Sequence, residues 1–166
     1  MGVESQKRIE IVKCLMSGIL KPHLHAACLA YVQDRIAAAT QAMQAAQESA
    51  NSETKSSAGD KYETGRAMAQ EERNRNAVQL REAQNLHAEL ARINPEQACD
   101  TVRPGALVET SIGGFFISIS AGKLTVDGKD YFAVSAAAPV AVALSGKRAG
   151  EEAVFNGKVV SVYHVH

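Results

Sequence analysis

Two patterns of apolar and polar positions divide this chain. Over the first 95 residues, apolar side chains recur at steps of three and four, which places them on one face of a helix. The most regular run follows this spacing over three heptads and comprises Leu29, Val32, Ile36, Ala39, Met43, Ala46 and Ala50. Such a run is typical of helices that pair as a coiled coil. It predicts one long helix from His23 to about Ala50.

A second apolar stripe predicts a partner helix that begins near Asp60 and ends at about Ile93, before Asn94-Pro95. Its apolar positions are Ala69, Ala77, Leu80, Ala83, Leu86, Leu90 and Ile93, and Arg73 and Asn76 interrupt them. Helices joined by a short polar stretch fold back on each other as antiparallel neighbours. We therefore expect a helical hairpin with its tip near residues 52–64.

The chain before this hairpin has an apolar face of its own over residues 4–20. This face predicts a short amphipathic helix. Pro22 is expected to break or kink the chain, because proline lacks the backbone N–H and its ring clashes with the preceding turn. The pattern does not say what this helix packs against, and it leaves the oligomeric state open.

From residue 102 the apolar pattern changes to the period of two that is typical of strands. Strands are predicted at 106–110, 115–120, 124–126, 131–134, 153–155 and 159–165, with turns at Asp127-Gly128 and Asn156-Gly157. A short helix is predicted at 139–144, with Gly146 ending it. The sequence thus predicts an α+β protein: residues 1–95 form a helix plus the hairpin, and residues 96–166 form a compact antiparallel sheet wrapped on one short helix.

Charge and composition narrow the classes of function. The 18 basic and 18 acidic residues cancel, so binding of nucleic acid through bulk charge is not expected. The three cysteines are too far apart for a zinc knuckle, and their odd number favours a reducing cytoplasm over a disulfide framework. No stretch approaches the roughly 20 apolar residues of a membrane span. We expect a soluble, cytoplasmic protein.

The candidate chemistry lies in Gly59-Asp60-Lys61-Tyr62-Glu63, at the predicted tip. On a helix, residues three apart lie on the same face, so Asp60 and Glu63 can share a metal ion that a partner presents. The same spacing is also that of a capping box, in which Asp60 would cap the helix and Glu63 would reach back. Spacing alone leaves both interpretations open.

Two segments resemble the Gre-type transcript cleavage factors of bacterial RNA polymerase. Residues 138–152 are similar to that family's Ser-Pro, Ala-Leu, Gly-Lys and Gly-Asp/Glu segment, with Ala138 in place of the serine. Gly59-Asp60 with Glu63 matches the family's Gly-Asp-x-x-Glu at the tip of its coiled coil. The resemblance covers most of residues 24–165 and leaves the first helix unexplained.

The resemblance implies an antiparallel coiled-coil hairpin followed by an FKBP-like C-terminal domain, which docks at the rim of the polymerase's secondary channel. The hairpin would enter that channel, where Asp60 and Glu63 would help hold a catalytic Mg²⁺ in the polymerase complex. The protein would be no enzyme and have no cofactor of its own: the polymerase itself would cut the backtracked RNA, and contact with nascent RNA would be indirect.

Four further residues are candidates for contact with the polymerase. Lys61 and Tyr62 stand between the two carboxylates, where the family usually has a serine before the glutamate, and Lys147 and Arg148 follow the short helix. An exposed turn is the simpler interpretation of each pair. Three alternative functions remain open: a channel-binding regulator without cleavage activity, a prolyl isomerase suggested only by the FKBP-like fold, and a structural coiled-coil adaptor.

Overall fold

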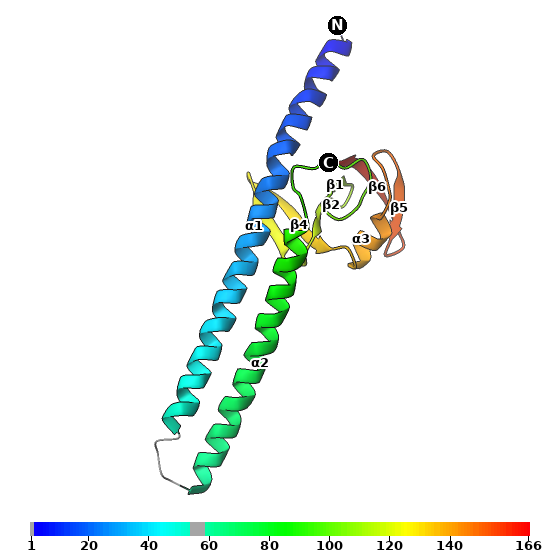
Figure 1. Cartoon of the computed structure of the whole chain (residues 1–166). Coiled ribbons are helices and arrows are strands. Elements are labelled where there is room, and N and C mark those ends of the chain that lie inside the picture. Colours follow the sequence, from blue (N-terminus) through cyan, green and yellow to red (C-terminus); the bar gives the residue numbers. More distant parts are fainter. Residues whose placement is uncertain (1, 54–58) are drawn as a thin grey trace. The chain divides into compact units, whose positions relative to one another are not determined.

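The computed structural model describes the backbone of residues 2–53 and 59–166, and the side chains of residues 18–52 and 63–166. Two long helices, α1 (Gly2–Glu53) and α2 (Gly59–Ala91), precede a six-stranded sheet and one short helix (Figure 1). The remaining elements are β1 (Leu107–Thr110), β2 (Gly113–Ser118), β3 (Gly122–Val126), β4 (Lys129–Ser135), α3 (Pro139–Leu144), β5 (Glu152–Phe155) and β6 (Lys158–Val165). The α+β class is therefore confirmed.

Contacts within the chain divide it into two compact units. The β unit comprises Met1–Leu29 and Glu89–His166, and the hairpin unit comprises Ala30–Ala88. The predicted division into residues 1–95 and 96–166 rests on composition and stays a prediction.

Helix α1 runs through Pro22 without interruption, so the prediction of a separate helix over 4–20 with a break at Pro22 is wrong. Proline leaves the carbonyl of the residue four positions earlier without its helical donor. That residue is Gly18, which is exposed, so water can hydrate its carbonyl. On the other side of Pro22, Leu24 and Cys28 are fully buried. Their packing compensates for the lost hydrogen bond, and tertiary packing decides helix formation here.

The hairpin unit contains the second part of α1 and most of α2, lying side by side (Figure 1). The apolar run predicted in α1 is the face that packs: Val32, Ala39 and Ala46 are buried, and the positions between them are half-buried. The helical hairpin is thus confirmed, while knobs-into-holes packing of a coiled coil stays a prediction. The predicted turn includes residues 54–58, which lie outside the described residues.

Of the two polar residues that interrupt the stripe of α2, Arg73 is exposed and Asn76 is buried. Asn76 is only 6% exposed, and its Nδ2 atom has no hydrogen-bond partner. A buried amide without a partner costs about 1–3 kcal/mol. The hairpin unit therefore carries a local penalty in the middle of its packed face.

In the β unit, the strands are ordered β3-β4-β2-β1-β6-β5. Four neighbouring pairs are antiparallel as predicted, but β2 and β4 are parallel, so the prediction of a wholly antiparallel sheet is wrong at that pair. The reason is the path of the chain after β2. Residues 119–121 reverse the chain, but β3 does not pair with β2 and instead leaves the place beside β2 open. The next strand, β4, reverses direction again and fills that place, so it runs parallel to β2.

Both faces of the central strands are covered. Alternate residues of a strand point to opposite faces, and β2 is buried at four consecutive positions from Phe115 to Ser118. Phe115 and Ile117 pack with α3, β5 and β6 in the main core, which also includes Leu144, Val160 and Val162. On the other face, the Ser118 hydroxyl oxygen lies 3.8 Å from Cys28 Sγ of α1. The first part of α1 therefore completes the fold of the β unit.

Across the described residues, no helix is long and apolar enough to cross a membrane.

Candidate functional site

The predicted tip carboxylates lie on the first turns of α2. Asp60 is the second residue of this helix and Glu63 the fifth, so they are three positions apart on one helical surface. The side chain of Glu63 is exposed, and that of Asp60 lies outside the described residues. At 1.5 Å per residue, the α2 segment from Gly59 to Ala88 is about 45 Å long. The two acidic residues thus stand at the end of the hairpin unit farthest from its covalent connections to the β unit.

The local electrostatics of this turn favour acidic side chains. The N-terminus of a helix carries a partial positive charge, and a carboxylate there contributes about 0.3–1 kcal/mol. A capping box would place Asp60 just before the first helical residue. In the structure Gly59 is the first residue of α2, so Asp60 is the second. Lys61 and Tyr62 belong to the same turn. Their side chains lie outside the described residues.

Asp60 and Glu63 can supply only part of a metal site. Mg²⁺ takes octahedral oxygen ligands and is usually held by one or two carboxylates together with water and other groups. Within the described side chains, no three His, Cys, Asp or Glu residues gather as a metal site. Two carboxylates alone would leave most of the octahedral positions of a Mg²⁺ ion to water or to other groups.

The other predicted contact residues, Lys147 and Arg148, belong to the β unit and follow α3. Gly146 has a φ of 75°, which ends α3 as the sequence predicted. The backbone of this turn is fixed, because Gly146 N–H donates to Val102 O and Val102 N–H donates to Lys147 O, both at 2.9 Å. The Arg148 N–H donates to Glu151 Oε2 at 2.7 Å, and its side chain is exposed. The turn thus presents Arg148 to solvent on a rigid backbone.

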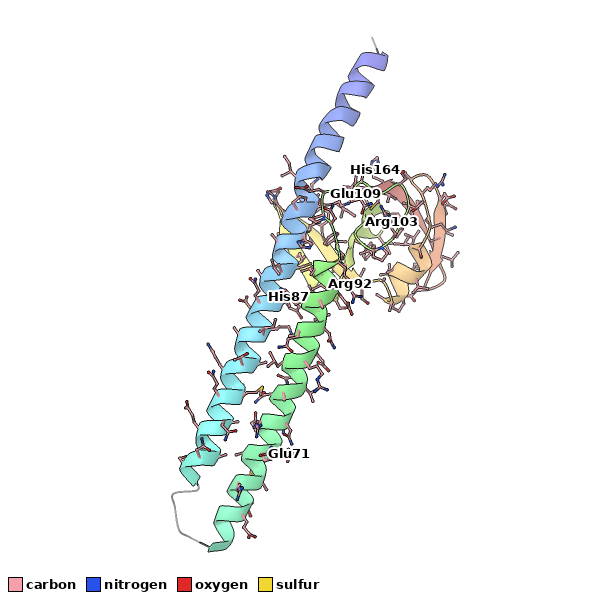
Figure 2. The ribbon with its side chains drawn as sticks, viewed as in Figure 1. Glu71, His87, Arg92, Arg103, Glu109 and His164 are labelled. Atoms are coloured by element: carbon pink, nitrogen blue, oxygen red, sulfur yellow. The ribbon has the colours of Figure 1, made fainter. Side chains whose placement is uncertain are left out.

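A cavity of about 630 Å³ in the β unit was not predicted. Exposed arginines line it from two segments: Arg92 directly follows α2, and Arg103 precedes β1 (Figure 2). Ser118 of β2, Ser135 of β4 and Cys99 also line it. These residues come from segments far apart in the sequence. No local motif could have revealed the cavity.

Next to this cavity, Lys21 of α1 is buried inside the β unit, with only 3% of its surface exposed. Its ammonium group donates to Gln97 O at 2.6 Å and to His166 O at 3.1 Å, and its Nζ atom lies 3.8 Å from Cys99 Sγ. Burial lowers the pKa of Lys21 below its usual value; the nearby Cys99 acts against this shift, and Arg103 adds to it. One signal in the sequence could have revealed this burial, because Lys21 is three residues from Leu24 and seven from Cys28, on the same face of the helix.

Comparison of the sequence with models of known protein families found no match, and comparison with curated proteins found none either.

Proposed function

We propose that this protein binds RNA polymerase as a transcript cleavage factor of Gre type. One observation carries the proposal. Two acidic residues, Asp60 and Glu63, share the first turns of α2 at the end of a helical hairpin some 45 Å long. A hairpin of this kind is slender, since each of its two helices is only about 10–12 Å across with its side chains. Its end can therefore deliver carboxylates to a place that a globular domain does not reach.

In this proposal the chemistry belongs to the polymerase. Asp60 and Glu63 would complete the coordination of a Mg²⁺ ion at the polymerase active centre and orient its bound water. A metal-bound water has a lowered pKa and becomes a stronger nucleophile toward the RNA phosphodiester. Lys61 and Tyr62, on the same turn, would contact the polymerase or the RNA 3′ segment beside the metal.

The β unit would provide the docking surface at the rim of the channel. The FKBP-like assignment of the C-terminal part and the coiled-coil packing of the hairpin belong to this proposal. Lys147 and Arg148 are its candidate contacts, and the fixed backbone of their turn supports that role because a rigid turn loses little entropy on binding.

The test uses a purified backtracked elongation complex with Mg²⁺ and the full-length protein. Wild-type protein is compared with a variant carrying Asp60→Asn and Glu63→Gln. The matched control carries Glu71→Gln and Glu72→Gln, which removes the same charge from exposed positions farther along α2. These two glutamates form only exposed ion pairs with Arg75, at 3.9 and 3.7 Å, so their loss costs little stability.

Shortening of the RNA by the wild type and the control, but not by the tip variant, is the expected result. Equal shortening by all three proteins would refute the role of the tip carboxylates. Absence of binding to the polymerase, measured by co-migration on a native gel, would refute the whole proposal.

A channel-binding regulator without cleavage activity is the second candidate. The observation in its favour is Lys61, which adds a positive charge between the two carboxylates in the sequence. Such a charge weakens the attraction of the turn for a cation. Binding without shortening in the same assay, together with shortening restored by Lys61→Ser, would assign this function.

A further inference from the structure

We propose that Lys21 and Cys99 are a modification site, at which a hydroperoxide joins the lysine nitrogen to the cysteine sulfur as a reversible sulfenamide. The inference concerns the β unit alone and does not depend on the proposed function. It rests on the two side chains being buried together, with Nζ 3.8 Å from Sγ.

The geometry brings a nucleophile to an oxidisable atom. The hydrogen bonds to Gln97 O and His166 O hold the end of the Lys21 side chain beside Cys99. The flexible four-carbon stem of lysine can close the remaining gap. Burial also lowers the pKa of Lys21, which increases the fraction of neutral amine, the form that attacks sulfur.

The oxidant can occupy the cavity that Cys99 lines. Cys99 is only 5% exposed. It is nevertheless one of the residues that line the cavity of about 630 Å³, together with Arg92 and Arg103. A small neutral molecule such as hydrogen peroxide fits in such a space. Cys28 provides an internal contrast, because it is fully buried and its polar partner is the Ser118 hydroxyl. Burial raises the pKa of the Cys28 thiol and so disfavours the reactive thiolate.

The reaction balances in two steps. First, the Cys99 thiol loses its proton, and the thiolate attacks one oxygen of hydrogen peroxide; the O–O bond breaks and leaves a sulfenic acid and hydroxide, which takes up the released proton to give one water. Then the neutral Lys21 amine attacks the sulfur, an S–N bond forms, the S–O bond breaks, and the hydroxyl leaves as a second water with a proton from the amine. Overall, the protein loses two hydrogen atoms and one peroxide is reduced. A thiol reductant reverses the product by attacking sulfur and releasing the amine.

The cross-link would close a loop between residues that are 78 positions apart. That loop contains the whole hairpin unit. Constraining a long loop reduces the entropy of the unfolded chain and so stabilises the folded state. Oxidation would therefore fix the first part of α1 more firmly to the rest of the β unit, and reduction would remove that added constraint.

The experiment uses the full chain with Cys14→Ser and Cys28→Ala, because a disulfide between Cys99 and either cysteine would cause the same mass change. The protein is treated with hydrogen peroxide, quenched with catalase and analysed by intact mass and by peptide mapping. The expected result is a loss of about 2 Da and a peptide pair joined through Lys21 and Cys99, both reversed by dithiothreitol.

The matched control adds Lys21→Arg, which keeps the positive charge and several donors but is not a nucleophile. It should lose the cross-link and instead leave a sulfenic acid that dimedone traps. If this variant fails to fold, the cross-linked peptides from wild-type protein are fragmented instead. Fragmentation locates the bond at the Lys21 nitrogen and so supplies the same information. The proposal is overturned if Cys99 yields only dimedone-reactive or more highly oxidised sulfur, if the link retains an oxygen atom, or if the link persists in the arginine variant.

Discussion

Replacing Asn76 by alanine should stabilise the hairpin unit, although the change shortens a buried side chain. Asn76 is 6% exposed and its Nδ2 atom has no partner. Removing an unsatisfied buried donor gains about 1–3 kcal/mol. Alanine adds up to about 0.7 kcal/mol of helix propensity. The substitution also removes roughly one buried CH₂ equivalent, which costs about 0.8 kcal/mol of hydrophobic stabilisation.

The matched control is Asn74→Ala, two residues away on the same helix. Asn74 is exposed and only accepts a hydrogen bond from Gln70 at 3.2 Å, a contact worth about 0.2–0.5 kcal/mol. Both variants gain the same helix propensity, so their difference isolates the cost of burying the amide. We expect Asn76→Ala to be the more stable variant by about 1 kcal/mol.

Amide hydrogen exchange along α2 is the suitable assay, because it reports the local opening free energy of the hairpin unit in a chain with two units. Slower exchange in Asn76→Ala than in Asn74→Ala is the expected result. If Asn76→Ala exchanges faster, the amide contributes net stability where it lies, and the reasoning from the unpaired donor is wrong.

Three further predictions concern the β unit. Gly114→Ala should lower the thermal midpoint through a loss of about 1–3 kcal/mol, because the added Cβ would lie 2.6 Å from the buried Tyr131 ring; an unchanged midpoint would contradict this contact. Ala138→Ser should raise stability to urea by about 0.5–1 kcal/mol, since the N-cap of α3 now has no side-chain hydrogen bond; no gain would show that the serine does not cap. The pKa of Asp130 is held below its usual value chiefly by the Thr125 hydroxyl at 2.7 Å and then by Lys123, so Thr125→Val should raise it in an NMR titration. Because the folded-state pKa is the lower one, this carboxylate stabilises the fold above its unfolded pKa, and that contribution is lost as the pH falls through the folded value.

Local signals were sufficient to predict most of the elements. The Asp127-Gly128 and Asn156-Gly157 pairs do form turns, with φ of 52° and 51° at Asp127 and Asn156, because these residue types tolerate the left-handed conformation that such turns require. Gly146 ends α3 for the same reason. The apolar run of α1 identified its packed face, since its spacing matches the helical period.

What the sequence did not reveal depends on contacts between distant residues. Pro22 is a breaker by local rules, yet the helix continues through it because packing beyond it outweighs one missing hydrogen bond. Arg73 and Asn76 look alike as polar interruptions, and only the packing of the two helices decides that Asn76 faces inward. The positions of Asp60 and Glu63 on one turn could be predicted because three-residue spacing is a local property, whereas Lys21 and Cys99 meet only in the folded chain.

The discontinuous make-up of the β unit has a consequence for how the chain folds as it is synthesised. The partners of Lys21 lie 76, 78 and 145 residues later, so the first part of α1 cannot complete its contacts until the last strand has been made. The hairpin unit is one continuous segment and can form earlier from local contacts, which assemble fastest. During that interval the packing that buries Leu24 and Cys28 in the folded chain is incomplete. In the nascent chain, the segment around Lys21 is therefore open to aggregation or chaperone binding until β6 has emerged from the ribosome.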